Sequence, residues 1–102
     1  MPSGRSASRF GDADVIHCTV PFRALGSFNV LINGLFASRQ GDPNTLHLKP
    51  CSCPPCCCPH IAMIATGSPT VFVNGRMAAR MGDPIAGCTS VGMGSPNVFI
   101  GP

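Results

Sequence analysis

At 102 residues the chain has the length of one small domain, near the size at which a hydrophobic core alone is marginal and a metal, disulfides or assembly supplements it. Charged residues make up 11% of the chain and the formal net charge is only +3, which excludes the dense basic surface of a nucleic-acid-binding protein. The 12 glycines and 11 prolines predict many turns, and the scarcity of charge indicates a face buried against a partner.

The N-terminal segment, residues 1–14, is polar and contains glycine, so it lacks the apolar run of a secretion signal. The longest apolar runs, such as 61–65, are far shorter than the roughly 20 residues of a membrane span. We therefore expect synthesis and a reduced state in the cytoplasm. Because the seven cysteines are an odd number, we expect metal ligands or free thiols before a disulfide framework.

Two sequence patterns each occur three times along the chain. One contains Arg-x-Gly-Asp and the other begins with Gly-Ser; they lie at 7–17, 37–47 and 78–88, and at 26–34, 67–75 and 94–101, respectively. The middle of the chain therefore holds two complete units, and the two termini together supply a third. We predict a pseudo-threefold all-β domain of three strand-turn-strand units, in which the strand near Ile100 pairs with the strand near Arg5 to Phe10.

Three apolar segments are the predicted strands: Asn29–Asn33, Thr70–Asn74 and Asn97–Ile100. Asn74-Gly75 is a strong hairpin signal, and Gly82-Asp83-Pro84 predicts another turn. The strands are apolar on both faces, which fits either central core strands or strands that bury one face and dock a partner with the other. No segment predicts a convincing helix, although 61–65 has the length of a short turn.

The spacing between the Arg-x-Gly-Asp patterns grows from 30 to 41 residues between the second and the third. The extra residues fall in a Pro/Cys-rich insertion at 48–59 within the single domain 1–102. Five cysteines and four prolines so close together predict a loop, because proline interrupts both helices and central strands. The repeated Arg and Asp side chains indicate ion pairs and Asx-type hydrogen bonds that hold the turns.

Metal-ligand side chains follow the Gly-Asp turns at a constant distance. His17, His47 and Cys88 each lie six residues after the turn glycine, so the repeat brings them together near the axis. His60 completes a set of three imidazoles and one thiolate, which suits tetrahedral Zn²⁺. We predict one zinc ion held by His17, His47, His60 and Cys88; because four protein ligands leave no open position, the site is structural. Cys18, beside His17, is the competing sulfur ligand.

The insertion admits more than one chemistry. Its cysteines are Cys51, Cys53, Cys56, Cys57 and Cys58. A second zinc, a copper(I) site or a redox pair are possible uses, whereas the simpler interpretation, which we favour, is a loop near the zinc without a second ion. The sequence contains no carboxylate pair and no nucleophile beside a base, so we expect no enzymatic activity.

Several segments resemble the PAAR-repeat proteins, which form the sharpened tips of contractile injection machines such as the type VI secretion system. The matching residues are Gly67-Ser68-Pro69, Val71 to Gly75, Ala78-Ala79-Arg80-Met81-Gly82-Asp83 and Gly94 to Gly101. The chain departs from the pattern where the name-giving proline is Met77 or Phe36, and where Ser38 and Ser8 replace the second alanine.

The resemblance implies a small conical domain whose base sits on a trimeric VgrG-type β-helical spike, one copy per trimer, with a zinc near the apex. In that family three His and one Cys hold the metal, and these correspond to His17, His47, His60 and Cys88 here. The implied role is mechanical: a rigid point that pierces an envelope and touches the target membrane only transiently. Because the chain leaves little room for a fused domain, we expect effectors to bind non-covalently. The tip would be cytoplasmic before firing and then injected with the spike.

A second hypothesis from another functional class remains open at this point. The chain would then be a small metal-handling protein in which the Cys-rich insertion carries a labile ion and the repeats serve as a scaffold. A labile ion exchanges readily with a weak chelator, whereas a structural ion leaves only when the fold melts.

Overall fold

The computed structural model describes residues 4–16, 18–50 and 57–101, and within these ranges it contains strands and turns but no helix. The strands form four antiparallel two-stranded ribbons. The pairs are β1 (Arg5–Ser6) with β8 (Phe99–Ile100), β2 (Leu31–Ile32) with β3 (Leu35–Phe36), β4 (His47–Pro50) with β5 (Cys57–His60), and β6 (Phe72–Val73) with β7 (Arg76–Met77). The predicted all-β class is confirmed. It follows that no helix suited to crossing a membrane occurs in these ranges.

Three of the ribbons are the repeated units, and the third is closed by the two ends of the chain. The turns of the β2–β3 and β6–β7 hairpins are Asn33-Gly34 and Asn74-Gly75, with φ between 53° and 78° at all four residues. Positive φ at both central residues defines the type I′ turn, which asparagine and glycine tolerate best. In the third ribbon Arg5 pairs with Ile100. The predicted closure of the repeat by the termini is therefore confirmed.

A ring of backbone hydrogen bonds marks the pseudo-threefold axis. Ser8 N–H donates to the Ala79 carbonyl, Ala79 N–H to the Ser38 carbonyl, and Ser38 N–H to the Ser8 carbonyl, each at 3.0 Å. All three residues are at most 1% exposed. Serine can replace the second alanine of the motif because the axis demands a small side chain and the ring uses only the backbone, although the Ser8 and Ser38 hydroxyls are buried without a hydrogen-bond partner among the described residues.

The two faces of the repeated strands have different environments. Ile100 and Val73 are 8% exposed and, with Ile32, pack into a core cluster at this end of the molecule. Leu31, Phe72 and Phe99, one residue earlier in each strand, are 55–57% exposed. The interpretation as strands buried on both faces is wrong, and that of one inward and one outward apolar face is confirmed. The strands are shorter than predicted because each strand soon leaves its partner and forms backbone hydrogen bonds with a neighbouring unit. One example is the bond that Phe10 N–H donates to the Phe36 carbonyl.

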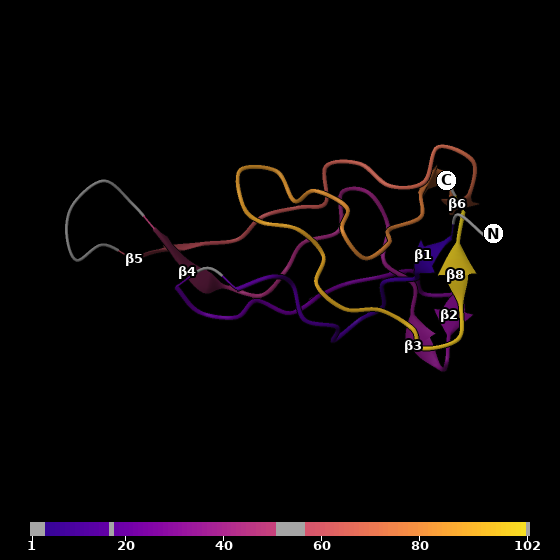
Figure 1. Cartoon of the computed structure of the whole chain (residues 1–102), viewed down its shortest axis with the longest axis horizontal. Helices are drawn as coiled ribbons and strands as arrows, with labels where there is room; N and C mark the ends of the chain where they lie inside the picture. The colour runs from indigo at the N-terminus through magenta and orange to yellow at the C-terminus, as the bar shows by residue number, and fades with distance from the viewer. Residues whose placement is uncertain (1–3, 17, 51–56, 102) are drawn as a thin grey trace.

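The molecule is elongated, with principal extents of 43 × 30 × 23 Å. Figure 1 shows the repeated strands, among them β1 and β8, gathered at one end, which we call the base, and the β4–β5 ribbon at the opposite, narrower end, which we call the apex hairpin. A second core cluster between them contains the buried residues Ala62, Ile64, Ala79, Ile85 and Val91. These features give the small conical β domain that the resemblance implied.

The apex hairpin corrects the prediction of a loop at the two ends of the insertion 48–59, whereas residues 51–56 lie outside the described residues. Residues 48–50 and 57–59 are paired strands, with Pro50 opposite Cys57 and Leu48 opposite Pro59. Proline is tolerated here because a two-stranded ribbon has edges on which a missing N–H breaks no ladder bond. Cys51, Cys53 and Cys56 lie outside the described residues. Residues 61–65 run extended instead of turning, since Met63 bridges to Pro43 and Ile64 to Ile85.

Candidate metal centre

His47 and His60 face each other across the first rung of the apex hairpin. They are paired residues in the ladder, and their ring centroids lie 4.3 Å apart. Residues directly opposite in an antiparallel pair project side chains to the same face, so strand pairing alone brings these two imidazoles together. The insertion therefore has a structural consequence: its two strands place the fourth predicted ligand, His60, beside His47.

Cys88 joins the two histidines from a different part of the chain. A turn returns its N–H to the Ile85 carbonyl at 3.0 Å, with Gly87 at a φ of 62°. The Cys88 Sγ lies 3.3 Å from His47 Nε2, and one ligand atom from each of Cys88, His47 and His60 lies within 4.8 Å of the others. Tetrahedral zinc with its usual bond lengths separates N and S ligands by about 3.3–3.8 Å. The three side chains can thus hold a metal ion.

The orientation of His47 favours metal binding through Nε2. Its Nδ1 lies 2.8 Å from the Thr45 carbonyl oxygen, which accepts only if Nδ1 carries the proton. Nε2, the atom that faces Cys88, then presents its lone pair. The residue is 4% exposed, so the ring is held in place by its surroundings. A backbone carbonyl that fixes the tautomer is a common partner of metal-bound histidine.

Burial raises the pKa of the Cys88 thiol above its ordinary value, which disfavours the thiolate in the absence of a cation. A backbone hydrogen bond from Thr89 and the side chain of Asn44, whose Nδ2 is 3.9 Å from Sγ, oppose the rise. A bound cation would stabilise the thiolate far more strongly than these dipoles do. The site therefore has donors that suit a soft or borderline divalent metal.

Two residues named as candidate ligands, His17 and Cys18, are not part of the described metal centre. His17 lies outside the described residues, so its place at the centre stays a prediction. Cys18 forms a disulfide with Cys57, with Cα atoms 6.0 Å apart, and Cys58 is disulfide-bonded as well. The expectation of metal ligands or free thiols is therefore wrong for these three cysteines. Cys18 meets Cys57 because the chain at Cys18 runs beside the apex hairpin. A disulfide sulfur is no thiolate ligand, so among the residues that the structure describes Cys88 is the thiol that can donate sulfur.

A buried polar chain beneath the centre was missed by the sequence analysis. Asn44, 1% exposed, donates to Asp14 at 3.2 Å, and Arg23 pairs with Asp14 at 2.8 Å with both side chains 0% exposed. Burial raises the pKa of Asp14, while Arg23 and Asn44 oppose that rise. Asp14 and Asn44 each lie three residues after the turn glycine, so the offset that indicated the ligands would also have indicated them.

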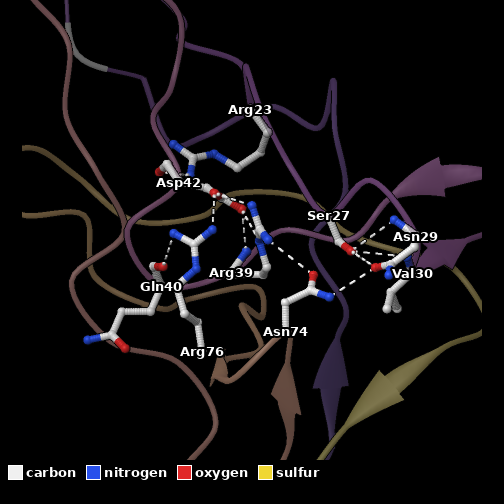
Figure 2. A network of polar contacts seen from close by, with 9 residues as sticks. All are labelled: Arg23, Ser27, Asn29, Val30, Arg39, Gln40, Asp42, Asn74 and Arg76. Carbon is white, nitrogen blue, oxygen red and sulfur yellow. Dashed lines mark hydrogen bonds and ion pairs between the residues drawn. The ribbon is translucent and has the colours of Figure 1, made fainter.

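The Arg-x-Gly-Asp turns form a belt between the base and the centre. In each turn the Asp carboxylate accepts a hydrogen bond from the Arg backbone N–H at 2.7–2.8 Å. Its two oxygens also accept hydrogen bonds from two nitrogens of the Arg guanidinium. In Figure 2, Arg39 reaches both Asp42 and Asn74, and Asn74 continues to Asn29 of the next unit. Arg23 also donates to the Asp42 carbonyl, 3.1 Å away. The predicted role of the repeated charges in fixing turns is confirmed, and the belt connects the two ends of the molecule.

Comparison with known proteins decides the family. The family model for the PAAR motif matches residues 25–91, well over half of the chain. The chain belongs to the PAAR-motif family. No curated protein matches it. The family places this chain among the tip proteins of contractile injection systems, and the resemblance noted in the sequence is thereby confirmed.

Proposed function

We propose that this PAAR protein caps a trimeric VgrG-type β-helical spike, one copy per trimer, and sharpens it for piercing a target envelope. The observation that carries the proposal is the threefold arrangement of exposed apolar side chains at the base. Leu31, Phe72 and Phe99 occupy equivalent positions and are 55%, 57% and 57% exposed. A monomer with pseudo-threefold symmetry can offer the same contact to each subunit of a true trimer.

The base has further features that suit a protein partner. Phe28 is 81% exposed, and Val30 and Val71 are more than one third exposed. Large exposed apolar side chains gathered at one end of a small protein usually mark an interface. The repeated Arg-Asp pairs lie in the belt of turns behind it, and Arg5 and Arg76 of the base strands β1 and β7 pair with Asp83 and Asp42 of that belt, so docking at the base would desolvate few unpaired charges.

We propose one structural zinc ion at the candidate metal centre, held by His17, His47, His60 and Cys88. The donor set of imidazoles and one thiolate suits zinc, and four protein ligands leave no position for substrate. When bound, the ion would fix the two strands of the apex hairpin to the turn of Cys88. The proposed role is accordingly mechanical and not enzymatic.

The remaining parts of the proposal follow from the family. We propose that the tip waits in the cytoplasm on its spike, is then injected, and touches the target membrane only transiently. Effectors would travel bound non-covalently to the tip or the spike. The alternative of a metal-handling protein is less well supported, because Cys57 and Cys58 of the insertion are disulfide-bonded and offer no thiolates.

The test is co-purification with candidate trimeric spike proteins, followed by mass measurement of the complex. We expect one chain per trimer, and the variant Phe72→Asp should abolish the complex while the thermal midpoint stays unchanged. Leu46→Asp is the matched control, since Leu46 is 68% exposed but lies beside the metal centre. Failure to bind any trimeric spike, or equal binding by Phe72→Asp, would rule out docking through the base.

A further inference from the structure

The disulfide Cys18–Cys57 ties a separate segment of chain to the apex hairpin. Cys18 and Thr19 donate their N–H groups to the Leu48 carbonyl at 3.1 and 3.4 Å, and Leu48 N–H donates to Thr19 Oγ1 at 3.0 Å. This segment therefore lies along β4, while the disulfide reaches the other strand, β5. The crosslink consequently holds three pieces of chain together at one end of the ribbon.

The candidate metal centre occupies the other end of the same ribbon. The ladder runs from His47 opposite His60, through two further pairs, to Pro50 opposite Cys57. At about 3.4 Å per residue, the disulfide and the two histidines are about 10 Å apart along the strand. An isolated two-stranded ribbon is only marginally stable in water. Each of the two constraints therefore stabilises the structure that the other requires.

We propose that Cys18–Cys57 is a thiol–disulfide exchange site whose oxidation state sets the metal affinity of the centre. The proposal rests on the metal centre of the proposed function but not on spike binding. In the oxidised form the paired strands hold His47 and His60 in register before the ion arrives. In the reduced form the ion must also order the ribbon, so part of its binding free energy is lost and its affinity falls.

The reacting class is a low-molecular-weight thiol such as glutathione. Cys57 is exposed and Cys18 is half-buried, so a thiolate reaches the Cys57 sulfur more readily. Its attack forms a mixed disulfide on Cys57 and releases the Cys18 thiolate, which takes up a proton. A second thiol then attacks the mixed disulfide, which leaves two protein thiols and one small-molecule disulfide. The reverse reaction, with the small disulfide as oxidant, restores the crosslink.

Thermodynamic linkage gives the proposal a second, independent consequence. If the disulfide raises metal affinity by some factor, bound metal must favour the disulfide over the dithiol by the same factor. A tenfold coupling corresponds to about 30 mV for a two-electron couple. The metal-bound tip would then keep its crosslink at thiol concentrations that reduce the metal-free protein.

The experiment measures zinc affinity by competition with a chromophoric chelator, using the full chain with the disulfide intact or reduced by a phosphine. We expect at least tenfold weaker binding after reduction. The double variant C18S/C57S should match the reduced protein and show no response to the phosphine, although it keeps Cys58. A glutathione titration of the wild-type disulfide with and without zinc should show the reciprocal shift, and hydrogen exchange at Ser8, Ser38 and Ala79 reports whether the base stays folded.

The outcomes separate the proposal from the function on which it rests. Equal zinc affinity in both redox states, or tight binding by C18S/C57S, overturns the coupling and leaves the metal centre intact. If C18S/C57S binds zinc as tightly as the oxidised wild type and loses affinity only after phosphine treatment, the coupling belongs to the Cys58 disulfide and the role of Cys18–Cys57 is overturned. If neither redox state binds zinc, both the coupling and the metal centre are wrong.

Discussion

The base and the apex of this protein are stabilised in opposite ways. At the base three units repeat one another, and just behind it a ring of backbone bonds among Ser8, Ser38 and Ala79 joins them. At the apex the symmetry ends, because the hairpin there belongs to a single unit. This hairpin carries two histidines of the candidate metal centre and one end of a disulfide. Repetition suits a surface that meets a threefold partner, whereas a narrow end with little core needs covalent or metal constraints.

Removing the metal should have the largest effect on stability, and this effect should fall on the apex and not on the base. We expect the metal-free protein and Cys88→Ser to lose several kcal/mol of stability, because ligand binding to the folded state alone contributes on the order of 4 kcal/mol or more when the ligand is far above its Kd. Hydrogen exchange should become fast in the apex hairpin and stay slow at the ring of Ser8, Ser38 and Ala79. Equal loss of protection at both ends would contradict the division into two differently stabilised regions.

The buried ion pair between the two ends should have the next largest effect. Arg23→Met leaves the Asp14 carboxylate buried without its cation, which costs about 3–5 kcal/mol. Thermal and denaturant unfolding measure the loss. The double variant Arg23→Met with Asp14→Leu removes both charges, and we expect it to recover a large part of the stability. A double variant as unstable as the sum of the singles would show that the pair contributes mainly through packing.

The repeated part of the fold was predictable because repetition multiplies each signal. Three imperfect copies predict the turn Asn74-Gly75, the closure by Ile100 and the offset that brings Cys88 to His47. The same copies allow two interpretations of the outward face of the strands, a core face or a docking face. Burial decides between them, and burial depends on neighbours that no local pattern specifies.

The apex was less predictable because its residues occur once. Proline and cysteine in 48–59 indicated a loop, yet pairing of His47 with His60 overrides the local propensities at both ends of the insertion. The Cys18–Cys57 disulfide joins residues 39 apart, and no spacing rule gives disulfide connectivity. Arg23 lies in neither repeated pattern, so its buried pairing with Asp14 needed the three-dimensional fold.

A smaller change at the base tests how far the belt couples the units. Asn74→Ala loses the bonds to Arg39 and Asn29 and places alanine at a φ of 53°, so we expect a cost of about 1–2 kcal/mol. Asn74→Gly is the matched control, because glycine accepts the turn but makes neither bond. If both variants unfold at the same thermal midpoint, the lost stability comes from the hydrogen bonds and not from the backbone conformation.

The two forms of the metal centre should respond oppositely to pH. In the metal-free protein burial raises the pKa of Cys88, so the folded state keeps its proton while the unfolded chain ionises. Stability should therefore fall as the pH rises through and above the ordinary cysteine range. In the metal-bound protein the thiolate is already formed, and acid should displace the ion and lower stability. Unfolding midpoints measured from pH 5 to 10 in both forms check the opposite slopes.

The smallest effect on stability should come from single exposed apolar side chains, and it sharpens the comparison between the two ends. Phe72 at the base and Leu46 at the apex are 57% and 68% exposed, so Phe72→Ser and Leu46→Ser should each change stability by less than about 0.5 kcal/mol. Spike binding should nevertheless weaken strongly for Phe72→Ser and stay unchanged for Leu46→Ser, as a pull-down at graded spike concentrations would measure. Because the pseudo-threefold base presents Leu31 and Phe99 in the positions equivalent to Phe72, their serine variants should weaken binding to a similar degree. A loss confined to one of the three would mean that the partner contacts the base asymmetrically.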